Sequence, residues 1–524
     1  MVIPITWKPY LFFVGETSYD GNNVTAFNET QDGGNNMVDQ ALLSGIVGPE
    51  NVYSDGTTRD RYSKDISFVD AVRPERVVKP QNRQEVGRLV ALANDDLMPL
   101  VPVSSGPPHF RGDTVPGEGG AVIVDLSRMK KIVRIDRLNR VAMVEPGVTF
   151  GELLPQLEAA GLRINMPLLP RNEKSVVGSL LGREPVTMPG YQWDIGDPLD
   201  CLEVVFGNGD IFRTGSAAGP GSIEEQLAAG GAQDEPLGPG QTSWHRAVQG
   251  AQGTLGIVTW ATVRCELLPR IEEPFLIGSP SLDRLLEMAH WLVRLRLVNE
   301  CFLLNNVDLA VSFAERWPEG YPNATVSSPS WVLFFVLAGY HYFPEERVAY
   351  QTEDMRGVAQ RLGLEPVKRI GPLSAADVLR TARKPSIEPY WKLRPAGACE
   401  DVFFLATRDK LPELVETMFS TAIEAGYPTS DLGTYLQPVV QGTSFHCEFN
   451  LFYNPDDQRA VEVTRNLSKE ATRRLMDRGA FFSRPHGENA RMIVNRDAAT
   501  VAALRKIKTI FDPNNIMNPG KLCF

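Results

Sequence analysis

The chain has 524 residues, 43% hydrophobic and 22% charged, which is the balance of a folded globular protein of two or more domains. Its formal net charge of −11 and its lack of a basic run exclude general nucleic-acid binding, because phosphate contacts need clustered Lys and Arg. The six cysteines are too widely spaced for a C-x-x-C motif, which argues against zinc and iron–sulfur sites and favours free thiols in a reducing, cytoplasmic compartment.

The N-terminal half predicts short strands that alternate with helices. Residues 1–37 are polar and Gly/Asn-rich, predict an irregular arm and show no signal-peptide pattern. A helical pattern in 37–55 ends at a Gly-Pro pair, and 74–106 predicts a strand, a helix that begins after Asn82 with Glu85 three residues later, and a second strand. This strand runs into the loop VSSGPPHFRGD, residues 103–113.

The pattern continues as an α+β region to residue 269. Strands are predicted in 119–149, an amphipathic helix in 150–162, a hairpin turning at Asn208-Gly209, and a strand after the Gly-rich turn near 250. The Gly/Ala/Pro-rich stretch 216–243 predicts a surface excursion.

A second unit begins near residue 274 and predicts an antiparallel sheet covered by helices on one face. The expected strands are 274–279, 331–340, 401–407 and 444–453, and the expected helices are 282–297, 345–362, 410–425 and 456–478. The longest apolar run, 331–340, is half the length of a membrane span and predicts a buried strand.

Several common enzyme motifs are absent from the sequence. There is no G-x-G-x-x-G after a strand, no P-loop, no G-x-S-x-G and no H-E-x-x-H. Three other segments, 103–113, 175–182 and 250–256, are rich in glycine and small residues. Such loops expose backbone N–H groups that bind anions, so together they favour a pyrophosphate site, although each one alone is also typical of a tight turn.

The blocks VSSGPPHFRGD, SVVGSLLG, GAQGTLGIVT and FDPNNIMNPGK, in this order, resemble the FAD-linked oxidase superfamily. Within it, the chain resembles the vanillyl-alcohol oxidase and 4-cresol dehydrogenase branch over about residues 38–524. The resemblance implies an α+β fold with a two-part FAD-binding domain of the vanillyl-alcohol oxidase type, 38–270 and 481–524, around a cap domain, 271–480, with a helix-covered antiparallel sheet.

The resemblance also implies the residues that bind FAD, which we expect to be held without a covalent bond because the cap segment 381–397 has no His and Tyr390 is a doubtful match. These residues belong to the three loops and the C-terminal block: Ser104, Ser105, Gly106, Pro107, Pro108, His109, Val177, Gly178, Ser179, Gly253, Gly256, Ile257, Val258, Asn518 and Lys521.

The catalytic residues are likewise implied by the resemblance, with departures from it. Asp194 stands where the branch has an Asp near the flavin, and Asp197 is its competitor. Arg111 and Ser483 stand at the positions of two phenol-binding tyrosines, whereas Arg484 matches the arginine beside them. Two arginines in one pocket favour a carboxylate over a simple phenol.

Three further polar residues extend the candidate site. In SFHCEFNLFY (444–453), strand alternation puts His446 and Glu448 on the face opposite Phe445 and Cys447. His486 is the preferred general base because imidazole titrates in the working range. These residues, His446, Glu448 and His486, are also a candidate metal site, although hydrogen-bonded polar residues of the pocket are the favoured explanation and a solvent-facing strand is the remaining one.

We therefore predict an FAD-dependent oxidoreductase that takes a hydride from an alcohol or benzylic carbon of a small aromatic or anionic hydroxylated substrate. The alternatives are a metal-assisted 2-hydroxy-acid dehydrogenase and a flavin-binding electron-transfer subunit. The expected partners are the substrate and an electron acceptor, for which oxygen, a cytochrome and a quinone stay open. We also expect a homodimer or higher homo-oligomer without nucleic acid or a membrane span.

Overall fold

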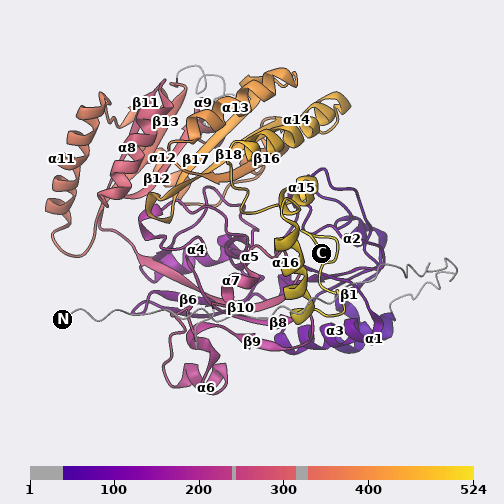
Figure 1. Ribbon diagram of the computed structural model, residues 1–524. Helices are drawn as coiled ribbons and strands as arrows, with labels where there is room; N and C mark the ends of the chain where they lie inside the picture. The colour runs from indigo at the N-terminus through magenta and orange to yellow at the C-terminus, as the bar shows by residue number, and fades with distance from the viewer. Residues whose placement is uncertain (1–38, 239–242, 314–327) are drawn as a thin grey trace, which may run out of the picture. The chain divides into compact units, whose positions relative to one another are not determined.

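The computed structural model describes residues 39–238, 243–313 and 328–524, which belong to one compact unit (Figure 1). The N-terminal arm predicted for residues 1–37 lies outside this range. Three sheets organise the unit, and the mixed α+β class predicted from the sequence is confirmed. Among the described residues, no helix is long and apolar enough to cross a membrane.

The first sheet has four strands and carries the opening loop of the candidate site. Its order is β1 (Val52–Tyr53), β2 (Arg76–Val78), β4 (Val122–Asp125) and β3 (Leu100–Val103), with helices α1 (Gln40–Val47), α2 (Gly56–Asp60) and α3 (Arg83–Asp96). The side chain of Asn82 accepts a hydrogen bond from the backbone of Glu85, so the predicted cap of α3 is confirmed. Leu89 and Val90 of α3 pack on Val122 and bury this face.

The other two glycine-rich segments belong to the second sheet and its helices, since 250–256 leads into its central strand and 175–182 contains a short helix. Its strands run β5 (Ile132–Asp136), β6 (Val141–Val144), β10 (Gly256–Leu267), β8 (Leu199–Phe206) and β9 (Ile211–Arg213), and β7 (Leu162–Ile164) also pairs with β10. The helices are α4 (Phe150–Ala159), α5 (Val176–Leu181), α6 (Ile223–Ala228) and α7 (His245–Val248). The hairpin between β8 and β9 turns at Gly209, which has a φ of +88°, as the Asn-Gly pair predicts.

The third sheet is antiparallel and confirms the helix-covered sheet predicted for the second half. Its order is β11 (Ile271–Ser279), β13 (Trp331–Gly339), β12 (Val298–Asn305), β17 (Leu432–Val439), β18 (Ser444–Tyr453) and β16 (Ala398–Ala406). Helices α8 (Leu282–Arg294), α11 (Pro344–Leu362), α13 (Leu411–Glu424) and α14 (Gln458–Asp477) bury one face, as Figure 1 shows. A short pair, β14 (Arg369–Ile370) and β15 (Leu373–Ser374), stands apart.

The sequence prediction missed two strands of the third sheet, β12 and β17, and two helices that cover it, α9 (Asn306–Phe313) and α12 (Ala375–Ala382). Strands β12 and β17 are buried along their whole length, so they lack the alternation that marks a half-exposed strand. Helices α9 and α12 pack on the second face, over the β11–β13–β12 side. The second face of β18 and β16 is therefore free to border the candidate site.

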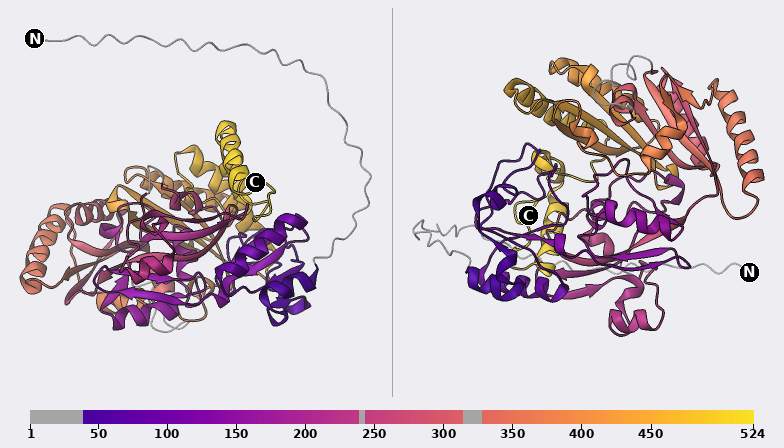
Figure 2. Two further views of the ribbon diagram at one scale, coloured as in Figure 1. Left: turned by 90° about the horizontal axis from the view of Figure 1, so that it is seen from below. Right: turned by 180° about the vertical axis from the view of Figure 1, so that it is seen from behind.

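The C-terminal segment returns to the first sheet after the cap sheet ends. It includes α15 (Ala490–Val494) and α16 (Ala498–Phe511), and Leu100 forms a parallel bridge with Met517. Figures 1 and 2 show this segment, in yellow, beside the indigo N-terminal elements. We therefore keep, as a proposal, the division into a two-part cofactor domain (38–270 and 481–524) and an inserted cap domain (271–480).

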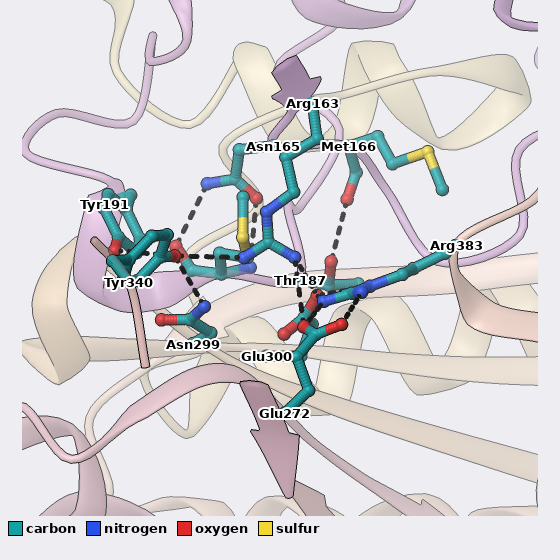
Figure 3. Close-up of polar contacts among 11 residues, drawn as sticks. Arg163, Asn165, Met166, Thr187, Tyr191, Glu272, Asn299, Glu300, Tyr340 and Arg383 are labelled. Atoms are coloured by element: carbon teal, nitrogen blue, oxygen red, sulfur yellow. Dashed lines mark hydrogen bonds and ion pairs between the residues drawn. The ribbon is translucent and has the colours of Figure 1, made fainter. Parts of the chain in front are cut away.

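A buried polar network joins the second sheet to the cap sheet (Figure 3). Arg163 of β7 donates to Glu300 of β12 at 2.7 Å, and Arg383, which follows α12, donates to Glu300 at 2.8 Å and pairs with Glu272. The hydroxyl of Tyr340 accepts a 2.7 Å hydrogen bond from the Asn299 amide. Two guanidinium groups thus balance two carboxylates, with Arg163 and Glu300 buried and Arg383 and Glu272 partly exposed, and this network ties the cap sheet to the second sheet.

Replacing Arg163 with methionine should lower the free energy of unfolding by about 3 kcal/mol, because Glu300 then loses one of its buried counter-charges. Urea unfolding followed by far-UV circular dichroism would measure the loss. The matched control is Arg140→Met, since the Arg140 side chain is half-exposed and pairs with Glu266 at 3.5 Å, so that about 1 kcal/mol or less is expected. Equal losses in both variants would contradict the structural role of the network.

Candidate active site

The main cavity of the described structure lies where the three glycine-rich loops meet the cap sheet. It holds about 1700 Å³ of empty space, including its open mouth. Three groups of the predicted residues line it: Ser104, Ser105, His109 and Arg111; Val177 and Gly178; Gly253, Gly256, Ile257 and Val258. Arg484 and His486 of the returning segment also line it. Segments up to 380 residues apart in sequence thus share one cavity.

Glycine is required where these loops approach one another. A Cβ on Gly178 would lie 2.6 Å from the Ser104 hydroxyl oxygen. Gly253 has a φ of +71°, and a Cβ there would lie 2.4 Å from the Pro102 ring. Ser105 accepts a 3.0 Å hydrogen bond from the Ser175 backbone, which ties the first loop to the second. The backbone can therefore come close to a ligand on this wall.

The cavity wall also offers an unpartnered histidine and a positive charge balance. His109 is 8% exposed, and its Nε2 has no hydrogen-bond partner among the described residues. Burial lowers the pKa of His109 to about 4, so its imidazole is neutral and can bond a ligand. The cavity lining contains five Lys and Arg side chains but only three carboxylates, so its charge balance is positive although the whole chain is acidic. This lining suits a group with two phosphates, such as FAD.

Other predicted cofactor residues support this wall from behind. Asn518 donates to the backbone oxygens of Asp113 and Gln252 at 2.9 and 2.7 Å, and so clasps two of the loops together. Lys521 is buried and lines a smaller adjoining cavity that shares Arg111 and Gln252 with the main one. Gly106, Pro107, Pro108 and Ser179 lie in the loops but not in the cavity lining.

We expect Gly253→Ala to retain FAD about tenfold less tightly than the wild type, because the methyl group collides with Pro102 and the left-handed backbone disfavours it. The ratio of flavin to protein absorbance after dialysis would report the loss. Gly119→Ala is the matched control, since no heavy atom lies within 4 Å of the added Cβ. If Gly253→Ala keeps its flavin as Gly119→Ala does, this loop does not hold the cofactor.

At the cap end of the cavity, Phe403 of β16 forms the centre of a charged aromatic cluster. The Arg484 guanidinium lies 4.0 Å from the ring centroid, and the His486 ring stacks on Phe403 at 4.7 Å. Arg111 lies 5.1 Å from the same ring and pairs with Glu184 at 3.0 Å. The segment that carries Arg484 is held in place because Arg183 donates to the Ser483 backbone oxygen at 2.6 Å.

Arg484 is the least compensated charge of this cluster. Both terminal nitrogens are buried without a hydrogen-bond partner in the described part of the chain. Burial, followed by the nearby Arg111 charge, lowers the pKa of Arg484. A buried guanidinium with two unused donors is costly by itself and matches a carboxylate, which would accept both N–H groups.

His486 lies beside Arg484 in a form that can accept a proton. Burial, followed by the nearby Arg111 charge, lowers the pKa of His486 to about 3. Its Nδ1 lies 3.4 Å from the Arg484 backbone oxygen. If Nδ1 carries the proton and donates to this oxygen, Nε2 is left with a free lone pair.

His446 and Glu448 lie just behind the cavity wall and not in it. His446 Nε2 is 3.1 Å from Glu448 Oε2, and the Lys392 ammonium, which does line the cavity, lies 2.6 Å from Glu448 Oε1. Burial lowers the pKa of His446 to about 4. Within the described ranges, no three His, Cys, Asp or Glu side chains are grouped as metal ligands, and these two together with His486 form no such group.

The structure does not bring Asp194 to the cavity. Its carboxylate pairs with Arg246 at 2.5 Å and accepts a hydrogen bond from the Gly196 backbone at 2.9 Å, in a partly exposed turn. Asp197, its competitor, accepts from two backbone N–H groups of the same turn. A position that matches a family in sequence does not determine where its side chain lies, so the resemblance was insufficient to place Asp194.

The segment 271–480 contributes four residues to the cavity wall, none of which was singled out from the sequence as a substrate-binding candidate: Tyr390, Lys392, Asp401 and Phe403. The signal that could have revealed Asp401 is an acidic residue at the start of an apolar strand, EDVFFLA. Lys392 stands in an irregular segment whose position depends on the fold around it.

Two domain families and several curated proteins are similar to this chain in sequence. The FAD binding domain family matches residues 74–215, and the C-terminal domain family of FAD linked oxidases matches 444–522. Glycolate oxidase subunit GlcD of Bacillus subtilis is 25% identical over 485 residues, which cover 91% of this chain and 95% of that protein. The 4-cresol dehydrogenase flavoprotein subunit of Pseudomonas putida is 30% identical over 187 residues, 35% of each chain.

Solved structures show the same fold. The 4-ethylphenol oxidase from Gulosibacter chungangensis superposes with a TM-score of 0.78 at 21% identity, over 92% of this chain and 96% of that chain. The structure of p-cresol methylhydroxylase gives a TM-score of 0.78 at 19% identity, over 93% and 96%. The domain-family matches confirm the expected cofactor and the solved structures confirm the fold, whereas the branch is supported only in part. The chain thus contains segments that match two domain families of FAD-linked oxidases, and it is an oxidoreductase with FAD as its cofactor.

Proposed function

We propose that this enzyme oxidises the CH–OH group of a small hydroxylated carboxylate and holds its FAD without a covalent bond. The observation that carries the proposal is the buried Arg484 guanidinium in the cavity, whose two terminal nitrogens have no partner among the described residues. Glycolate oxidase subunit GlcD and a mitochondrial D-lactate dehydrogenase of Arabidopsis thaliana (24% identical over 463 residues) are named for such substrates, which supports this choice.

In this proposal, three side chains of the cluster have a role in the reaction. Arg484 binds the substrate carboxylate through two N–H groups, and the Phe403 ring keeps water from the same wall. The bound FAD supplies the acceptor for the hydride that leaves the substrate carbon. His486 Nε2 takes the hydroxyl proton as the carbonyl forms, so the carbon is oxidised by two electrons and the proton has a defined destination.

A benzylic or phenolic substrate is the second candidate, and the likeness in fold to p-cresol methylhydroxylase favours it. Tyr390 is the one tyrosine in the cavity lining, so the cavity lacks the tyrosine pair that would hold a phenolate. Anaerobic mixing of the holoenzyme with glycolate, D-lactate, 4-hydroxybenzyl alcohol and 4-cresol would decide between them. Flavin bleaching by a hydroxy acid is expected, whereas bleaching by the phenols alone would overturn the leading proposal.

Two further alternatives are separated by the same preparation. A metal-assisted dehydrogenase would use His446 and Glu448, but Glu448 already pairs with the Lys392 ammonium, so we expect metal analysis of the purified holoenzyme to find no stoichiometric divalent ion. An electron-transfer subunit would show a flavin that none of the four compounds bleaches.

A further inference from the structure

The cap side of the cavity holds a buried ion cluster that the proposed chemistry does not use. The Lys392 ammonium lies 2.8 Å from Asp401 Oδ2 and 2.6 Å from Glu448 Oε1. All three side chains are at most 10% exposed. Lys392 and Asp401 line the cavity, whereas Glu448 lies behind them and is also bonded to His446.

Lys392 is held in this position by contacts on both sides. The 3₁₀ turn Trp391–Leu393 that carries it is anchored where the Trp391 backbone donates to the Ser386 hydroxyl at 3.1 Å. Ser386 in turn donates its backbone N–H to the Pro170 oxygen at 2.7 Å. Upstream, Arg383 joins the polar network of Figure 3. The ammonium is therefore fixed at the wall before any ligand arrives.

The cluster has one donor and one net negative charge to offer. An ammonium has three N–H donors, and the two carboxylates use two of them, with no third acceptor among the described residues. One Lys and two carboxylates leave a net charge of −1, opposite to the free positive charge of Arg484. A second carboxylate on the ligand would be repelled here, whereas the substrate hydroxyl could accept a hydrogen bond from Lys392, which Asp401 holds in place, while it donates its one proton to His486.

The two points lie within reach of one small molecule. The Arg484 guanidinium lies over the ring of Phe403, and Phe403 is the direct partner of Glu448 in the pairing of β16 with β18. Neighbouring strands are about 5 Å apart, so the Lys392–Glu448 pair lies roughly one strand spacing from the ring under Arg484. Both the Arg484 and the Lys392 charges act on the pKa of His446.

We infer that Lys392 and Asp401 form a hydroxyl-recognition point, so that the enzyme selects small hydroxylated monocarboxylates over their deoxy analogues and over dicarboxylates. This inference rests on the proposed function, because Arg484 must hold the carboxylate. A buried site that is built to bond a hydroxyl leaves its own groups unpaired when the hydroxyl is missing, and rejects such an analogue by up to about 10⁴-fold.

Binding to the holoenzyme, reduced beforehand with dithionite under argon, tests this without turnover, because reduced flavin accepts no hydride. Isothermal titration would compare acetate with glycolate, propionate with the two lactate enantiomers, and acetate with succinate. The wild type should bind glycolate at least about 100-fold more tightly than acetate, and the better of the two lactate enantiomers at least about 100-fold more tightly than propionate. Lys392→Met should reduce this preference to less than about fivefold and keep the weak binding of acetate.

Lys392→Met leaves two buried carboxylates unpaired, so Asp401→Asn serves as the second variant, because it leaves the Lys392–Glu448 pair neutral and intact. It should lower the hydroxyl preference about tenfold and weaken the rejection of succinate. An unchanged preference in Asp401→Asn, or no preference in the wild type, overturns the recognition point while carboxylate binding through Arg484 stands. If acetate and glycolate both fail to bind, or bind equally well to Arg484→Met, the proposed function itself is wrong.

Discussion

Arg484→Met should lower the second-order rate constant of flavin reduction by the substrate about 1000-fold, with FAD content unchanged. The buried guanidinium has no partner within the described residues, so the substrate carboxylate would be its main counter-charge. Loss of one partner of a buried, bidentate ion pair costs about 2–5 kcal/mol, which corresponds to this range. Stopped-flow absorbance of the flavin under argon would measure it.

Two companion variants make the Arg484 test specific. Arg484→Lys should recover about tenfold of the lost rate, since an ammonium keeps the charge but cannot reproduce the two parallel hydrogen bonds. Arg473→Met, on the exposed side of α14 where Arg473 pairs with Glu470, should reduce flavin at the wild-type rate. Wild-type reduction in Arg484→Met would show that the substrate anion binds elsewhere.

His486→Asn should lower the limiting rate constant of flavin reduction about 100- to 10 000-fold, while the substrate dissociation constant changes little. Asparagine keeps the size and the polarity of the side chain but cannot accept the hydroxyl proton. Single-turnover reduction at saturating substrate would separate the chemical step from binding. His341→Asn, at an exposed position on the cap, is the matched control. A His486→Asn enzyme with an unchanged limiting rate would exclude the proton-accepting role.

The pH dependence gives the same residue a second test. Neutral His486 is the active form, so activity is present above its pKa and is lost as the pH falls through about 3. The kcat/KM of the wild type should therefore stay level from pH 8 down to pH 5, where an ordinary histidine would already be protonated. A carboxylate bound to Arg484 offsets one of the charges that lower this pKa, so kcat should fall at a higher pH than kcat/KM.

Much of the candidate site could be predicted because its signals are local. The glycine-rich loops need close backbone approach at Gly178 and Gly253 whatever surrounds them, and the alternation of His446 and Glu448 with Phe445 follows from the two-residue repeat of a strand. The prediction for the cap sheet failed at β12 and β17, where both faces are buried and the pattern loses its period.

The sequence by itself predicted the fold class, because caps, turns and loop glycines act through neighbours a few residues away, and its resemblance to the FAD-linked oxidases implied the cofactor and the two arginine candidates. Only the tertiary structure decided which side chains line the cavity. It put Lys392, Asp401 and Phe403 in one cavity with Arg484, left Asp194 in a surface turn, and paired Arg111 with Glu184 while Arg484 has no partner among the described residues. The reason is that counter-ions and cavity walls are supplied by strand order and by segments about 80 to 370 residues apart, which no local pattern encodes.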